Sequence, residues 1–131
     1  MLEMKYMHAI LNLRPNALFS VIENNYDSLE WLDTEQTKPT KSEIDSELLR
    51  INDELKLVEI RTKRNELLIN TDKYSLTDYP HATDEIRQDW LTYRQDLRNI
   101  TNNLDLSVIT LEFDSLSNIQ INNLTFPNAP A

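Results

Sequence analysis

The apolar residues between positions 44 and 58 follow the spacing of an α-helix. They recur at intervals of four and three residues, which places them on one stripe of a helix. The members of this stripe are Ile44, Leu48, Ile51, Leu55 and Val58. Residues 40–43, Thr-Lys-Ser-Glu, form a capping-box pattern just before it. Because neither Pro nor Gly intervenes before residues 70–72, the pattern predicts one long, uninterrupted helix.

Beyond residue 58 the apolar stripe moves to another face of the same helix. Its members there are Leu57, Ile60, Leu67 and Leu68. A helix that changes its apolar face must bury the two faces against different surfaces. The pattern therefore indicates one helix with two successive packing partners.

A second helix is predicted from Thr83 to residues 102–103. Thr83 is a favourable N-cap residue, and two acidic residues follow it in the first turn. The apolar stripe of this helix contains Ile86, Trp90, Tyr93, Leu97, Ile100 and Leu104. Two such helices joined by the loop 71–82 are typical of an antiparallel helical hairpin. We expect the stripe at 44–58 to pack against this second helix, with a partner protein or a second copy of the chain as the alternative.

Short β-compatible runs precede the hairpin. Turn residues at 14–16 and 24–27 separate three runs, which predicts strands at 8–13, 18–23 and 29–32. An isolated sheet of three strands is marginally stable, so another element must cover it.

After the hairpin, residues 106–113 alternate as a strand does, and the remaining residues contain prolines typical of an extended segment. The predicted fold class is therefore α+β, with a small N-terminal antiparallel β-sheet, a long-helix antiparallel helical hairpin and an extended C-terminal tail. The predicted domains are a β module at 1–39, the helical hairpin at 40–104, and a strand with the tail at 105–131.

The composition excludes several classes of function. The 131 residues carry 22 acidic and 13 basic side chains, and this net charge of −9 argues against a protein that binds nucleic acid. The absence of Cys excludes thiolate zinc sites and thiol catalysis, and the absence of Gly excludes a glycine-rich phosphate loop. His8 and His81 lie in no catalytic or metal-ligand spacing. We expect no enzyme activity, cofactor or metal, and the apolar runs are too short for a membrane span.

Without Gly, left-handed turn positions are expected to fall on Asn, which tolerates them better than most residues. The candidate pairs are residues 24–25, 102–103 and 122–123.

The hairpin residues resemble a known family. They are Arg61-x-x-Arg64-Asn65-x-Leu67-Leu68-x-x-Thr71-Asp72-x-Tyr74, then Asp78-Tyr79-Pro80, then Trp90-x-x-Tyr93-Arg94-Gln95-x-Leu97-Arg98-x-Ile100. This order is similar to the tail-assembly-chaperone and tail-fibre-assembly-like domain of tailed bacteriophages. The front half, with Leu13-Arg14-Pro15-Asn16 and Glu30-Trp31-Leu32-Asp33, is similar to a short module that precedes this domain in marine and cyanobacterial phage virion proteins.

The chain departs from the family pattern at several positions. Lys73 and then Tyr74 stand where the family has Trp after Thr-Asp, and Asp96 stands where it has Ala. The closing Trp-Pro of the family is replaced by Phe126-Pro127.

The resemblance implies a phage protein that acts by binding other proteins. We expect a virion protein of the tail, baseplate or tail fibre, made in the host cytoplasm and bound to other tail proteins or to copies of itself. The alternative is a transient tail or tail-fibre assembly chaperone that is not retained in the particle. A host-directed inhibitor is a third reading, which only the acidity of the chain favours.

Three sets of residues are candidate sites. The apolar stripes, Ile44 to Val58 together with Trp90, Tyr93 and Leu97, are candidates for the hairpin core or for partner binding. Arg94 and Arg98 are predicted to lock the loop onto the hairpin through the region of Asp72 and Asp78, with exposed local ion pairs as the alternative. Phe126 and Pro127 are the tail-docking candidates.

Overall fold

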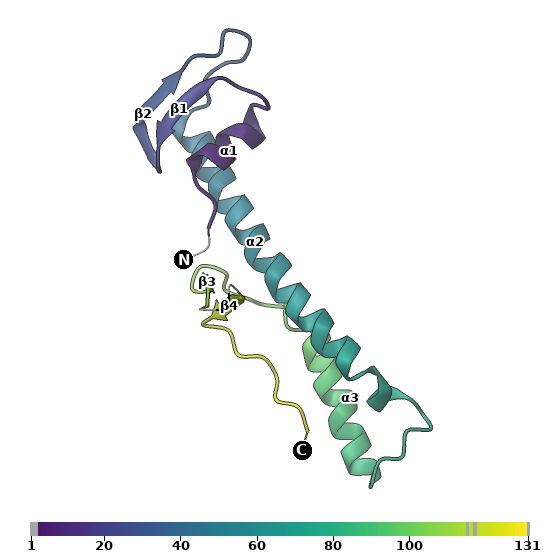
Figure 1. The fold of residues 1–131 in the computed structure, drawn as a ribbon. Coiled ribbons are helices and arrows are strands. Elements are labelled where there is room, and N and C mark those ends of the chain that lie inside the picture. Colours follow the sequence, from purple (N-terminus) through teal and green to yellow (C-terminus); the bar gives the residue numbers. More distant parts are fainter. Residues whose placement is uncertain (1–2, 115, 117, 131) are drawn as a thin grey trace. The chain divides into compact units, whose positions relative to one another are not determined.

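The computed structural model describes residues 3–114, 116 and 118–130. Its elements are α1 (Tyr6–Leu13), β1 (Phe19–Ile22), β2 (Asn25–Trp31), α2 (Lys41–Asn70), the 3-10 turn η1 (Asp72–Ser75), α3 (Asp84–Arg98), β3 (Thr110–Phe113) and β4 (Ile119–Asn122), as Figure 1 shows. The chain divides into two compact units, Met1–Leu55 and Lys56–Ala131, with the boundary inside α2. The predicted α+β class is confirmed. None of the described helices has the length and apolar character needed to cross a membrane.

The long helix α2 begins and ends where the sequence predicts. Thr40 and Glu43 form the capping box, because the Thr40 hydroxyl accepts a bond from the Glu43 N–H at 3.1 Å and the Glu43 carboxylate accepts one from the Thr40 N–H at 3.3 Å. The helix runs for 30 residues and ends at Asn70. The capping box at residues 40–43 and the polar residues 70–72 were therefore sufficient to predict where the helix begins and ends.

The first unit begins with a helix where a strand was predicted. Residues 8–13 belong to α1, so the predicted first strand is wrong. The reason is the spacing of the buried residues: Tyr6, Ala9 and Ile10 lie on one helical face, and a period-two reading that starts at residue 8 omits Tyr6. These three side chains pack in one buried cluster with Leu29 of β2 and with Ile44 and Ile51 of α2.

Strands β1 and β2 form an antiparallel hairpin that contributes to the same cluster. Phe19 pairs with Trp31 across the ladder, and the two rings stack with their centroids 6.1 Å apart. Strand β2 begins at residue 25 instead of residue 29, because the chain reverses direction in two residues. Glu23 has the left-handed conformation in this turn, so the expectation that residues 24–25 supply it is wrong. The expectation holds elsewhere, at Asn103 and Asn123.

The Asp33 carboxylate gives a pH prediction for the first unit. Three backbone N–H groups, those of Gln36, Glu35 and Leu18, donate to Asp33 at 2.8, 2.8 and 3.1 Å. These bonds, led by that of Gln36, hold the pKa of Asp33 below its ordinary value. A lowered pKa in the folded state stabilises the fold above the unfolded pKa, near 4, and this stabilisation is lost as the pH falls through the folded pKa.

We therefore expect the urea midpoint of the first unit, followed by Trp31 fluorescence, to fall on going from pH 6 to pH 3. The Asp33→Asn chain keeps an acceptor oxygen but does not titrate, so its midpoint should be less sensitive to acid. Equal acid sensitivity of the two chains would show that Asp33 is not one of the groups responsible.

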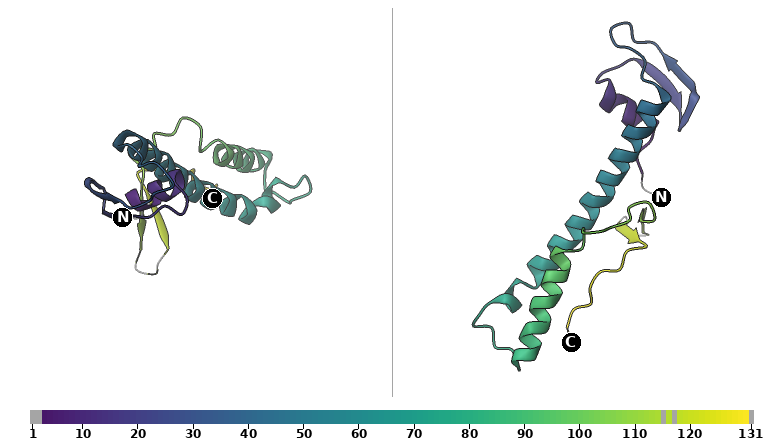
Figure 2. Two further views of the ribbon diagram at one scale, coloured as in Figure 1. Left: turned by 90° about the horizontal axis from the view of Figure 1, so that it is seen from above. Right: turned by 180° about the vertical axis from the view of Figure 1, so that it is seen from behind.

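In the second unit, α3 runs antiparallel beside the C-terminal half of α2 (Figure 2). Thr83 caps α3 as predicted, because its hydroxyl accepts a bond from the Ile86 N–H at 3.1 Å. The helix ends at Arg98, earlier than the predicted 102–103, because short-range turn bonds follow at Ile100 and Asn102 and Asn103 is left-handed. The expected final members of its stripe, Ile100 and Leu104, therefore lie outside the helix.

Replacing Thr83 by alanine removes the only side-chain acceptor that the described residues offer at this helix start. We expect a loss of about 1 kcal/mol in the free energy of unfolding of the second unit. Chemical denaturation followed by Trp90 fluorescence measures it. Thr92→Ala, at an exposed position within the same helix, is the control and should change the value little; an equal loss in both chains would contradict the capping role.

The second unit also contains a β-hairpin that was only half predicted. Strands β3 and β4 pair in antiparallel register from Thr110↔Asn122 to Phe113↔Ile119. The strand predicted at 106–113 is shorter than expected, and β4 lies in the segment expected to be an extended tail. Among the described residues of this unit, the largest fully buried side chains are those of Ile60, Leu97, Ile109 and Leu111.

Candidate partner-binding site

Arg94 fastens the end of α2 to α3. It is 5% exposed, and its guanidinium donates to the Leu68 carbonyl at 2.7 Å, the Thr71 hydroxyl at 2.8 Å and the Asp72 carboxylate at 2.6 Å. The Leu68 carbonyl is one of the last four carbonyls of α2, and these carbonyls have no N–H partner four residues further on within the helix. A cation at this position also interacts favourably with the helix dipole. Arg94 therefore satisfies the C-terminus of α2 and orders the first residues of the loop.

The other loop-locking candidates do not join this network. The structure brings Arg94 and Asp72 together, while Arg98 and Asp78 are exposed. Within the described part of the chain, neither Arg98 nor Asp78 has a side-chain hydrogen bond or ion pair to another residue. Arg98 lies one turn beyond Arg94 on α3, and none of the described contacts joins its guanidinium to α2.

Arg87, which was not among the predicted site residues, makes a second set of bonds to the loop. Its guanidinium donates to the carbonyls of Leu76 and Tyr79 at 3.1 and 3.0 Å. Arg87 and Arg94 are seven residues apart, which places them on the same face of α3. That spacing was the signal available in the sequence. Together the two arginines bond the loop 71–82 at its start and again at residues 76 and 79.

The loop 71–82 and α3 together carry a cluster of aromatic rings. Tyr74 stacks on Trp90 with a centroid separation of 4.0 Å, and Tyr79 meets the edge of Tyr74 at 5.0 Å. His81 lies 4.6 Å from Tyr79, and its Nε2 is 2.9 Å from the Tyr74 carbonyl oxygen. Trp90 also contacts Tyr93 edge to face at 5.7 Å. All of these rings except that of Tyr93 are partly exposed, and partly exposed aromatic rings are common in protein-binding surfaces.

The long stripe of α2 does not pack as expected. Ile44 and Ile51 are buried against α1 and β2, and Leu48 packs at the edge of the same cluster, so the expected packing of this stretch against the second helix is wrong. Leu55 is half-buried and Val58 is 43% exposed. On α3, Tyr93 and Leu97 are buried and Trp90 is half-buried. The change of apolar stripe near residue 58 was the sequence signal for this difference, because the boundary between the two units lies inside α2.

The tail candidates lie against the hairpin. Phe126 and Pro127 are half-buried, and the Lys63 ammonium lies 4.7 Å from the centre of the Phe126 ring. Further along, Pro130 lines a hollow of about 440 Å³ together with the aromatic cluster. Pro130 and Asn128 also line a hollow of about 260 Å³ against α3.

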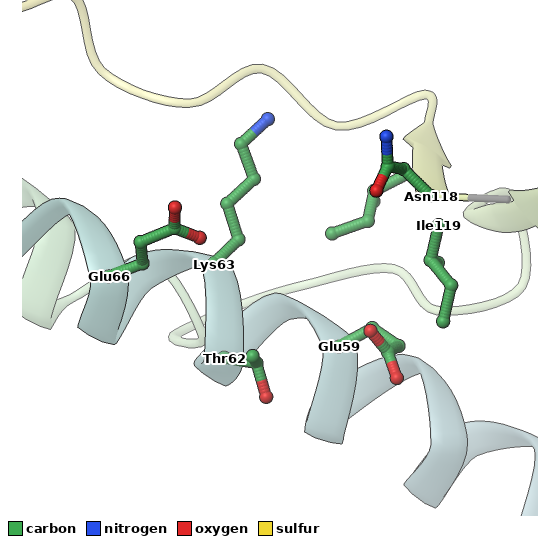
Figure 3. Close-up of a pocket in the computed structure, with 7 residues that line it drawn as sticks. Glu59, Thr62, Lys63, Glu66, Asn118 and Ile119 are labelled. Carbon is green, nitrogen blue, oxygen red and sulfur yellow. The ribbon is translucent and has the colours of Figure 1, made fainter. Parts of the chain in front are cut away.

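A third hollow, of about 490 Å³, lies between α2 and the β3–β4 hairpin (Figure 3). Its lining residues are Glu59, Thr62, Lys63, Glu66, Asn118, Ile119 and Ile121. The α2 side of this hollow is charged and the β4 side is largely apolar. No three His, Cys, Asp or Glu side chains of the described residues are arranged to hold a metal ion.

These observations define a small α+β unit built on a helical hairpin, with an aromatic face and a tail laid along it. The model of the phage tail assembly chaperone protein family matches residues 57–130, more than half of the chain, and the protein belongs to this family. The comparisons with curated proteins and with solved structures gave no match. The resemblance stated for residues 61–100 is confirmed, and the match continues through the tail to Pro130.

Proposed function

We propose that this protein is an assembly chaperone of the phage tail that binds another tail protein and is released before the particle is complete. One observation carries the proposal. The residues matched by the family model, 57–130, coincide with the second compact unit, Lys56–Ala131. The family signature is therefore the signature of a whole folded unit, and this unit is where the binding surface should lie.

The surface of this unit supports binding to a protein. Besides the aromatic cluster, several large apolar side chains are exposed on it, among them Ile69 (69%), Phe113 (59%), Leu76 (54%) and Val108 (52%). Strands β3 and β4 form a two-stranded sheet, so each described strand has an edge open to a further strand. A tail protein that is still being assembled exposes extended segments and apolar surfaces. These match the open strand edges and the exposed apolar side chains of the second unit.

The partner follows from the family and from the charge of the chain. We infer that it is a tail, baseplate or fibre protein, and that the protein has no enzyme activity and does not bind nucleic acid, given its net charge of −9. Self-association is the alternative use of the same surface. Light scattering of the purified chain distinguishes self-association from binding to a different protein, because a monomeric chain leaves this surface free for another protein.

Particle composition tests the transient role. Quantitative mass spectrometry should find the protein bound to tail proteins in extracts of producing cells and at most in traces in purified particles. The major tail proteins, measured in the same samples, provide the control for recovery. Stoichiometric recovery from purified particles would instead make it a virion structural protein.

A further inference from the structure

We propose that the aromatic face of the hairpin binds an extended, proline-containing segment of the partner, and that the tail of this chain occupies the same face as a built-in competitor. The inference rests on the proposed function and names the chemistry of the partner segment. Its basis is the way residues 124–130 lie on the second unit. The tail has no helix or strand of its own, yet it is not free of the surface.

Two prolines of the tail lie three residues apart and are buried to a similar extent. Pro127 and Pro130 are half-buried, as is Phe126, whereas Asn128 and Ala129 between the prolines are exposed. A polyproline II helix has three residues per turn, so prolines three apart lie on the same edge. The segment 127–130 therefore turns one proline edge toward the protein, with Asn128 at the border of the hollow against α3 and Ala129 in solvent.

The surface that receives this edge has the matching chemistry. Pro130 lines the hollow formed by Tyr74, Tyr79 and Trp90. Grooves lined by aromatic rings bind proline-containing extended segments, because the segment is already ordered and loses little conformational entropy. The stacking of Tyr74 on Trp90 and the bonds from Arg87 to the loop hold these rings in place before any ligand binds.

The tail also has a separate anchor on α2. Phe126 is half-buried beneath the Lys63 ammonium, four residues before Pro130. Anchor and proline edge together hold the tail by a few weak contacts and by no backbone hydrogen bond to the hairpin among the described residues. Contacts of this kind allow exchange: a partner segment with similar prolines can replace the tail, and the tail returns when the partner leaves.

The test uses the full-length chain and a peptide that binds from solution. The probe is an amidated peptide with the sequence of residues 124–130, and the control peptide carries serine in place of both prolines. The tail of the chain is weakened by the double substitution Pro127→Ser with Pro130→Ser. The matched control chain is Ala129→Ser, which alters an exposed residue between the two prolines.

The two tryptophans provide the readout. The indole N–H signal of Trp90 in NMR spectra reports on the hairpin face, and that of Trp31, in the first unit, is the internal reference. We expect the peptide to shift the Trp90 signal and to leave the Trp31 signal in place. A tethered tail competes at an effective concentration in the millimolar range, so the double variant should bind the peptide about tenfold more tightly than the native chain. Ala129→Ser should behave as the native chain does.

Tyr79→Ala, made in the double variant, removes one wall of the hollow and should weaken peptide binding about tenfold. The proposal is overturned if the peptide does not shift Trp90 in the folded double variant, if the serine peptide binds equally well, or if native and double-variant chains bind with the same affinity. Loss of helical circular dichroism in the double variant would also overturn it, because the tail would then be a fixed part of the fold. None of these results bears on particle composition, so the proposed function is tested separately.

Discussion

Replacing Ile44 by alanine should lower the free energy of unfolding of the first unit by about 3 kcal/mol. The Ile44 side chain is completely buried in the cluster that α1, β2 and α2 form, and its truncation leaves a cavity there. Urea denaturation followed by Trp31 fluorescence measures the loss, because Trp31 packs against the same cluster. Leu49→Ala, at a 64% exposed position of the same helix, is the control and should cost less than about 0.5 kcal/mol.

The experiment also decides which partner the N-terminal stripe of α2 has. If Ile44→Ala lowered the transition reported by Trp90 and left that of Trp31 unchanged, the stripe would stabilise the helical hairpin, as the spacing alone suggested. The structure predicts the reverse, because Ile44 and Trp31 belong to one cluster and Trp90 belongs to the other unit.

Replacing Arg94 by methionine should destabilise the second unit by about 3 kcal/mol. Methionine retains much of the packing volume but removes the donors to Leu68, Thr71 and Asp72, and it leaves the Leu68 carbonyl with only its bonds from Thr71. The bond to Asp72 contributes less than its length suggests, since the Asp72 side chain is 64% exposed. Denaturation followed by Trp90 fluorescence measures the change.

Arg98→Met is the matched control for this prediction. Arg98 is one turn away on the same helix and is exposed, so its replacement should change stability by less than about 0.5 kcal/mol. Equal losses in the two variants would mean that general charge at this end of α3, instead of the bonds of Arg94, stabilises the loop.

The helices of this protein were predictable because their signals are local. Thr40 and Glu43 fix the start of α2, and Thr83 fixes the start of α3, through bonds within a single turn. Helix α1 was missed because it is short and its pattern depends on Tyr6, which contacts residues far away in the sequence. Strand β4 was missed for a related reason: Ile119 and Ile121 become a strand only by pairing with β3.

The candidate site was predictable in part. Aromatic and arginine residues at helical spacing identified Trp90, Tyr93 and Arg94, and a bond between Arg94 and the region of Asp72 was among the expectations. Which arginine makes this bond depends on where α2 ends relative to α3, and no local pattern contains that distance. The position of the tail on the hairpin, with Phe126 near Lys63, likewise depends on contacts between distant residues.

The central claim is that the second unit holds a tail protein during assembly and releases it. Site-specific photo-cross-linking in producing cells tests this claim directly, with the reactive residue at exposed Pro80 on the rim of the aromatic hollow and, as control, at exposed Glu30 of β2. We expect an adduct between position 80 and a tail protein in cells before particles are complete, and none in finished particles. An adduct of position 80 only in finished particles, or an adduct of position 30 alone, would show that the second unit does not act as a transient chaperone.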